Sequence, residues 1–245
     1  MDASAPTEAR EKAEAVLESA SLQFSISGLQ ALTEFLDEQM ADAGTYSLRN
    51  NVGILKIYTL YPHIADPIVI QKILLQSLTQ LPASDFNICI AQIPLATQEH
   101  PVITPVIAMH SMVQNCMFYK FWEASLKPMA DNERPFIEVP GLRDSVRRFV
   151  LDVVPLVYLQ MSVPELRAML NFESNCEEFE ELLRSCKWSL EGYSREDPEA
   201  GICVPDARDE ILKQQKGPAQ LRDVEKYYRT ESVRTYYNTL RKAAG

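Results

Sequence analysis

The fold of this chain is decided by residues 162–206, which read SVPELRAMLNFESNCEEFEELLRSCKWSLEGYSREDPEAGICVPD. Its apolar spacing predicts a helix over 163–170 and a second helix over 175–187. Two short runs of strand-forming residues follow, over 188–193 and 201–204. Two helices followed by a β-hairpin form a winged helix, a module whose second helix often reads DNA.

The second helix of this module has the wrong charge for nucleic acid. Its apolar face consists of Phe179, Leu182, Leu183 and Cys186. That face is expected to turn four carboxylates outward, those of Glu177, Glu178, Glu180 and Glu181. Phosphates repel carboxylates and are bound by Lys and Arg, which displace counterions. The pattern therefore predicts a module that binds protein rather than DNA.

The chain before this module reads as a succession of helices with short connections. Apolar spacing, with proline and glycine breaks, predicts helices over 8–20, 26–40, 48–61, 67–81, 84–93, 104–116, 118–126 and 142–161. The sequences follow no strict period, which indicates an irregular HEAT- or TPR-like stack in a mainly α protein. The expected divisions are an N-terminal extension (1–20), the helical stack (21–140), the winged helix (141–210) and a C-terminal helix and tail (211–245).

Composition indicates a globular protein without membrane-spanning segments. Of 245 residues, 46% are hydrophobic and 24% are charged, which is ordinary for a soluble domain. The longest apolar runs are far too short to span a bilayer, and the N-terminus has no secretory signal pattern, so we expect no membrane partner. Five scattered cysteines without a CxxC pair fit reduced thiols in the cytosol or nucleus.

Charge is distributed unevenly along the chain. Residues 208–245 hold nine Lys and Arg against five Asp and Glu, which gives this segment a net charge of +4. Because the whole chain has a net charge of −10, residues 1–207 have a net charge of −14. The predicted C-terminal helix interleaves tyrosines with six cations that could contact single-stranded RNA: Arg222, Lys226, Arg229, Arg234, Arg241 and Lys242. The alternative is an amphipathic helix that packs on the chain itself or on partner helices while its cations stay in water.

Catalytic and metal-binding patterns are missing from the sequence. The histidines at 63, 100 and 110 are isolated, and there is no HExxH, GxSxG, Walker A or GxGxxG motif. A cysteine nucleophile would need a nearby base, but His110 and Cys116 are six residues apart and do not share a helical face. We therefore expect no catalytic residue, no metal and no cofactor.

Several stretches give the chain a resemblance to a known family. They are VGILKIY (52–58), QKILLQSLTQLP (71–82), SDF (84–86), Phe121-Trp122, GLRDSVRRFV (141–150), Leu166 to Leu170 and Lys187-Trp188. In order and spacing they resemble the PCI-domain scaffold subunits of the proteasome lid, the signalosome and translation initiation factor three. Within that group they are most similar to the subunit k branch of the initiation factor, over roughly residues 26–230.

The resemblance implies a non-catalytic subunit of initiation factor three that acts at the small ribosomal subunit, with subunit l as its direct partner. It also implies that the winged-helix edge and the terminal helix form the contact. The edge of a short hairpin and an exposed amphipathic helix are surfaces that partners cover. The expected partner-binding residues are Trp188, Leu190, Tyr193, Ile202, Val204, Val224, Tyr227, Tyr228, Tyr236, Tyr237 and Leu240. Trp188 could instead be a core residue.

Two other functions remain open from the sequence. A scaffold of the same architecture could belong to the proteasome lid or the signalosome, since physics alone does not separate these complexes. An RNA-binding accessory factor could act through the basic tail.

Overall fold

The fold is taken from a computed structural model that describes residues 7–130, 133–158, 160–172, 177–192 and 201–205. Contacts between Cα atoms divide the chain into two units, Met1–Pro205 and Asp206–Gly245. The predicted C-terminal helix and all of its candidate residues lie outside the described residues. No helix of the described part is both long and apolar enough to cross a bilayer.

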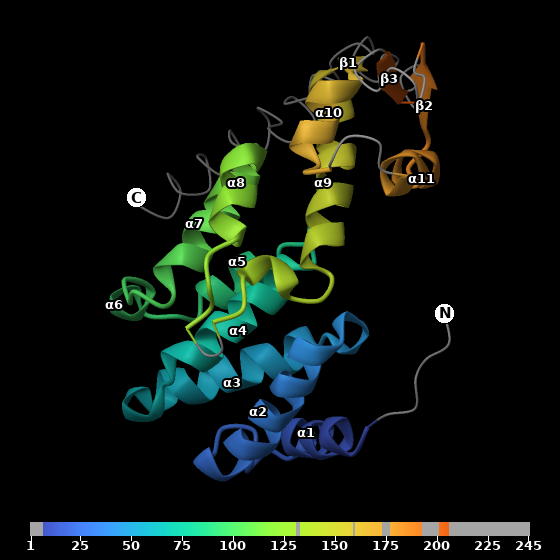
Figure 1. Ribbon diagram of the computed structural model, residues 1–245. Coiled ribbons are helices and arrows are strands. Elements are labelled where there is room, and N and C mark those ends of the chain that lie inside the picture. Colours follow the sequence, from blue (N-terminus) through green and yellow to red (C-terminus); the bar gives the residue numbers. More distant parts are fainter. Residues whose placement is uncertain (1–6, 131–132, 159, 173–176, 193–200, 206–245) are drawn as a thin grey trace, which may run out of the picture. The chain divides into compact units, whose positions relative to one another are not determined.

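The first part of the chain is a stack of helices, as Figure 1 shows. They are α1 (Glu8–Glu18), α2 (Ile26–Ala41), α3 (Leu48–Leu60), α4 (Pro67–Leu78), α5 (Asp85–Ile90), α6 (Leu95–Gln98), α7 (Thr104–Gln114) and α8 (Phe118–Ser125). Each longer helix packs on neighbours close in sequence: α1 on α2, α2 on α3 and α4, α4 on α5 and α7, and α7 on α8. Neighbour-on-neighbour packing of this kind is typical of helical-repeat stacks, and the predicted mainly α fold class is confirmed.

Local sequence signals set where these helices begin. The side chains of Thr7, Ser25, Ser47 and Asp66 each accept a hydrogen bond from a backbone N–H in the first turn of the helix that follows. Such caps satisfy donors that have no partner within the helix. At α4 the cap precedes Pro67, whose fixed φ suits the first helical position.

The core of the stack is formed by large apolar side chains on the inward faces. Fully buried examples are Leu32, Leu36, Ile54, Ile57, Ile73, Leu74 and Phe121. Leu32 and Leu36 are four residues apart and Ile54 and Ile57 are three apart, which is the helical periodicity that predicted these helices.

The segment between α8 and α9 packs on the stack, although its three prolines and charged centre are typical of an open loop. Pro128 and Pro135 form a β-bridge, and Phe136 and Ile137 are buried in a short 3-10 turn. The predicted divisions after residues 20 and 140 both fall within the unit Met1–Pro205.

Helix α9 (Leu142–Val157) leads from the stack to the second module. Its start follows Gly141, whose φ of 80° is a left-handed conformation that glycine adopts without strain. The predicted extension of this helix to Met161 is wrong, because Met161–Ser162 forms strand β1. That strand pairs with residues 40 and 42 positions later, and a local apolar period does not contain this information.

The second module is a winged helix of the predicted element order. It comprises α10 (Val163–Met169), α11 (Glu177–Ser185), β2 (Trp188–Glu191) and β3 (Ile202–Pro205). The sheet has the order β1-β3-β2 with antiparallel pairs, so β3 lies in the middle.

Candidate protein-interaction surface

The sheet offers one free edge that a partner could extend. Strand β3 is paired on both sides, with β1 and with β2, whereas β2 is paired on one side within the described residues. The two-residue β1 is too short to offer a useful edge of its own. A partner strand that adds to this sheet would therefore lie along β2, the strand from Trp188 to Glu191.

The register shows that the predicted hairpin residues belong to both faces of the sheet. Trp188 pairs with Pro205 and Leu190 pairs with Cys203, which places these side chains on one face. Glu191 pairs with Ile202, so these two side chains point to the opposite face. A single partner surface cannot contact all of the predicted residues at once.

Burial corrects the predicted hairpin surface further. Trp188 and Val204 are buried, so the chain itself covers their side chains, and for Trp188 the alternative of a core position holds. Leu190 is partly buried and packs against the core. Ile202 keeps 38% of its surface exposed and is the hairpin residue best placed for a partner. Tyr193 lies outside the described residues.

The acidic face of α11 consists of three outward carboxylates rather than the predicted four. Glu177, Glu178 and Glu181 are exposed, but Glu180 is buried and its Oε2 accepts a hydrogen bond from Arg184 at 3.3 Å. Glu180 lies at the margin of the apolar face, three residues before the buried Leu183, so tertiary packing covers it.

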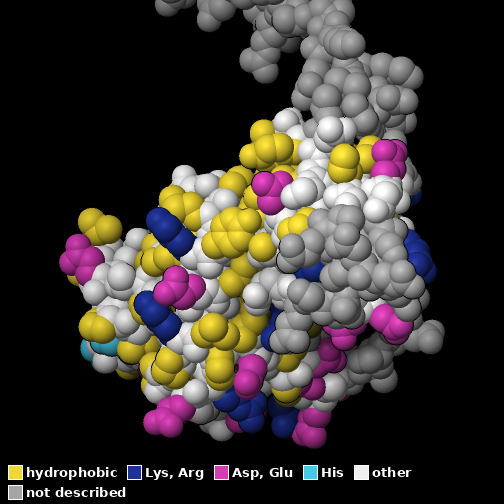
Figure 2. Space-filling model, turned by 45° about the horizontal axis from the view of Figure 1, so that its top comes forward, with side chains coloured by type: hydrophobic (Ala, Val, Ile, Leu, Met, Phe, Trp, Pro, Cys, Tyr) yellow, Lys and Arg dark blue, Asp and Glu magenta, His cyan; other side chains and the backbone are white. Residues whose placement is uncertain are grey.

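The remaining carboxylates still oppose binding to phosphate. Figure 2 shows one face of the molecule, on which Lys and Arg side chains are interspersed with Asp, Glu and hydrophobic ones. Within the described residues, that face carries no continuous basic stripe of the kind that follows a nucleic-acid backbone.

Sequence reasoning missed the contact that joins the winged helix to the stack. The C-terminal carbonyls of α10 lack partners within their helix. Trp122 of α8 donates its Nε1–H to the carbonyl of Met169 at 2.8 Å. Arg147 of α9 donates from Nε to the carbonyl of Leu170 and from a terminal nitrogen to that of Asn171, both at 3.0 Å. We call Trp122 and Arg147 together the carbonyl clasp.

Aromatic contacts reinforce the clasp. The Arg147 guanidinium lies 3.5 Å from the centre of the Phe172 ring, within cation–π range. Phe172 packs edge to face on Phe179 of α11, and Arg167 of α10 lies 5.7 Å from the ring of Phe179. The clasp therefore contacts the end of α10 directly, and Phe172 and Arg167 connect α10 to α11 within the winged helix. The sequence signals were present, since Trp122 and Arg147 both lie in stretches that carry the family resemblance.

An exposed apolar run was also missed. Leu156, Val157 and Tyr158, at the end of α9, expose 60%, 73% and 48% of their surfaces. They were expected inside a helix that continued to Met161, and the end of α9 at Val157 brings them to the surface just before β1. This run lies close before β1 in sequence.

The cysteines and histidines of the described part do not form a reactive or metal-binding cluster. Burial raises the pKa of the Cys89 thiol to about 12. Burial also raises the pKa of the Cys203 thiol to about 12, although the nearby positive charge of Arg167 lowers that pKa in part. His110 is buried and stacked on the Phe86 ring at 3.8 Å, and desolvation lowers its pKa. The described residues contain no group of three His, Cys, Asp or Glu side chains arranged to hold a metal.

A helical stack followed by a winged helix is the architecture of the PCI-type class of proteins. Within that class, a family model described as the CSN8/PSMD8/EIF3K family matches residues 64–213 of this chain. The chain belongs to the CSN8/PSMD8/EIF3K family.

Several curated relatives of the chain are named eukaryotic translation initiation factor 3 subunit K. The protein from Homo sapiens is 31% identical over 137 residues, which are 56% of this chain and 60% of the relative. The protein from Danio rerio is 31% identical over 149 residues, or 60% and 65% of the two chains. That from Anopheles gambiae is 28% identical over 130 residues, or 53% and 57%. Each match thus spans less than two thirds of the relative's length.

Proposed function

We propose that this chain is a non-catalytic scaffold subunit of the translation initiation factor 3 complex in the cytoplasm. The observation that carries the proposal is the identity of 31% over 137 residues to a protein named as subunit K of that factor. The family description also includes CSN8 and PSMD8, so family membership alone does not favour initiation over the other complexes. The relatives named as subunit K favour the initiation factor.

The architecture supports a scaffold role. Arg147 and Trp122 contact the winged helix through three hydrogen bonds to backbone carbonyls. Binding surfaces that are organised before a partner arrives lower the entropic cost of binding. The buried thiols of Cys89 and Cys203, with pKa values near 12, are protonated at neutral pH and are poor nucleophiles.

The free edge of β2 and the exposed Ile202 form the proposed contact with another subunit. The family resemblance implies subunit l as this partner, and the complex would connect the chain to the small ribosomal subunit. Strand addition at such an edge supplies backbone hydrogen bonds, and exposed apolar side chains beside it add burial.

The test is affinity purification of the tagged full chain from cytosol, followed by mass spectrometry and gradient sedimentation. We expect initiation factor 3 subunits in the eluate and co-migration with small ribosomal subunits. Recovery of proteasome-lid or signalosome subunits instead would overturn the pathway. Recovery of RNA without those subunits would favour action through the basic tail.

A matched pair of variants tests the contact itself. Ile202→Asp should reduce recovery of the neighbouring subunit, because it places a charge on an apolar contact. Leu95→Asp makes the same kind of change on α6, where Leu95 is 72% exposed, and should leave recovery unchanged. Equal recovery with both variants would exclude the Ile202 face as the contact.

A further inference from the structure

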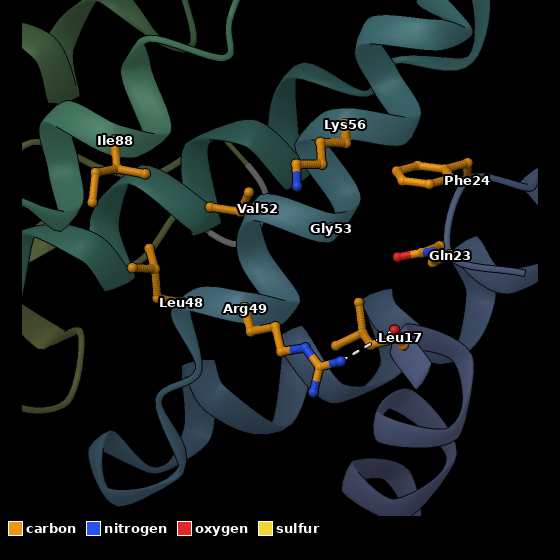
Figure 3. A pocket seen from close by; sticks show the side chains of 9 residues that line it. All are labelled: Leu17, Gln23, Phe24, Leu48, Arg49, Val52, Gly53, Lys56 and Ile88. Atoms are coloured by element: carbon orange, nitrogen blue, oxygen red, sulfur yellow. Dashed lines mark hydrogen bonds between the residues drawn. The ribbon is translucent and has the colours of Figure 1, made fainter. Parts of the chain in front are cut away.

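A groove of about 520 Å³ lies over α3, far along the chain from the winged helix. Its floor is one stripe of α3 that includes Val52, and its walls are the α1–α2 connection and α5. Figure 3 shows Phe24 and Ile88 on opposite sides of the α3 side chains. These two residues keep 43% and 41% of their surfaces exposed. Large apolar side chains gathered around a hollow are typical of a binding site.

The groove is built with a close contact at its floor. Gly53 of α3 has no side chain, and a Cβ there would lie 2.8 Å from a methyl carbon of Leu17. The glycine therefore lets α1 approach α3 closely, with Leu17 as part of the groove lining. This packing makes the hollow a feature of the folded stack rather than a gap between loosely placed helices.

The charges of the groove have one sign. Arg49 and Lys56 line it, and none of its other lining residues is acidic. One terminal nitrogen of Arg49 donates to the carbonyl of Leu17 at 3.2 Å. Neither cation forms an ion pair with a carboxylate of the described residues. Two such cations beside an apolar surface are notable in a chain of net charge −10.

Two other hollows of the described part contain charges of both signs, and a third is lined by uncharged residues alone. One has Lys72 and Arg134 together with Asp37 and Glu138, and another has Arg148 together with Asp144. Charge complementarity to an anionic ligand is therefore a property of the groove over α3 in particular.

We propose that this groove binds an acidic amphipathic helix of a partner protein. Arg49 and Lys56 are seven residues apart, which is about 10 Å along a helix. Carboxylates seven residues apart on a ligand helix that follows α3 span the same distance. The apolar residues between those carboxylates would fill the hollow between Phe24 and Ile88, as in helix-in-groove recognition.

The basic segment of this chain has the wrong charge for the same place. Residues 208–245 carry a net charge of +4, the same sign as Arg49 and Lys56. A partner with clustered carboxylates is the occupant that the groove favours. This inference does not depend on the complex to which the chain belongs, because its test uses the isolated full chain.

The first experiment measures fluorescence anisotropy with two synthetic 18-residue helices. Both have leucines at spacings of three and four, and one carries glutamates seven apart where the other carries lysines. We expect the glutamate peptide to bind at least tenfold more tightly than the lysine peptide, with an affinity that falls as salt rises. Equal binding of both peptides, or of neither, would overturn the proposal.

Variants of the full chain locate the site. Lys56→Glu changes an exposed side chain and should weaken binding of the glutamate peptide about tenfold, whereas Lys120→Glu on α8 makes the same charge change elsewhere and should not. Phe24→Ser should also weaken binding, with Leu126→Ser as its control at an exposed apolar position. An unchanged affinity in Lys56→Glu and Phe24→Ser would refute the assignment.

A photo-crosslinker in place of Phe24 identifies the occupant in cell extract. Attachment to an acidic helical segment of another protein supports the proposal. Attachment to residues 206–245 of the same chain, to a second copy or to lipid would overturn it.

Discussion

Replacement of Arg147 by Met tests whether the carbonyl clasp holds the winged helix on the stack. The change keeps the apolar stem of the side chain and removes its guanidinium. The carbonyls of Leu170 and Asn171 then lose their charged donors, and the ring of Phe172 loses its cation. Arg147 is only 8% exposed, so water does not readily replace these partners.

The magnitude follows from the contacts. A hydrogen bond to a charged group contributes about 1.5–3 kcal/mol, and a desolvated cation–π contact contributes about 2 kcal/mol. These contributions are not additive, and the rotamer entropy lost on burial is similar for Arg and Met, so it changes little between the two proteins. We therefore expect Arg147→Met to lower the free energy of unfolding by about 3–4 kcal/mol. Arg147→Lys keeps a charge but loses the planar fork, so about half of that loss is expected.

The free energy of unfolding of the full chain is measured by urea denaturation, with circular dichroism as the signal. Hydrogen exchange of the native chain then measures the protection of the backbone amides at the end of α10. Arg148→Met is the matched control, because Arg148 is the next residue on α9 and is exposed. Its free energy of unfolding should change by about 0.5 kcal/mol or less. If Arg147→Met and Arg148→Met have equal stability, or if exchange in α10 stays unchanged, the clasp does not join the modules.

Three further predictions concern residues elsewhere in the described part. Burial lowers the pKa of His110, so the unfolded chain binds this proton more readily than the folded chain. The free energy of unfolding should therefore fall as pH drops below about 6.5. His110→Gln should make the melting temperature depend less on pH between pH 5 and 8. Gly28→Ala should destabilise the chain by about 1–2 kcal/mol in urea titrations, because the new methyl would lie 2.8 Å from a backbone oxygen of the α1–α2 connection; unchanged stability would mean that the connection moves freely. Alkylation of the native chain, read by mass spectrometry, should modify exposed Cys116 first and reach Cys89 and Cys203 only on unfolding, so early modification of either buried thiol would contradict their packing.

Local signals in the sequence predicted the fold class and most of the elements in order, but not α6 and not β1. The apolar spacing of α2, α3 and α4 predicted these helices within a few residues, and the Asp66-Pro67 start of α4 was readable because caps act on their own first turn. The order of two helices and a hairpin after residue 162 likewise indicated the winged helix.

The candidate surface was only partly predictable, because it depends on pairing and burial. The sequence predicted strands near Trp188 and Ile202, but it did not show that β1 would cover one edge of β3. Burial of Trp188, Val204 and Glu180 likewise depends on which elements pack over them. A hydrophobic period gives the face of an element and not the neighbour that covers it.

Tertiary structure alone decided how the two modules are joined and where the chain is hollow. Trp122 and Arg147 meet the end of α10 from 23 to 47 positions away in sequence, and no local pattern specifies that encounter. The groove over α3 likewise needs the α1–α2 connection and α5 to lie on either side of one helix. Sequence periodicity acts over a few residues, whereas such sites form between segments that only the folded chain brings together.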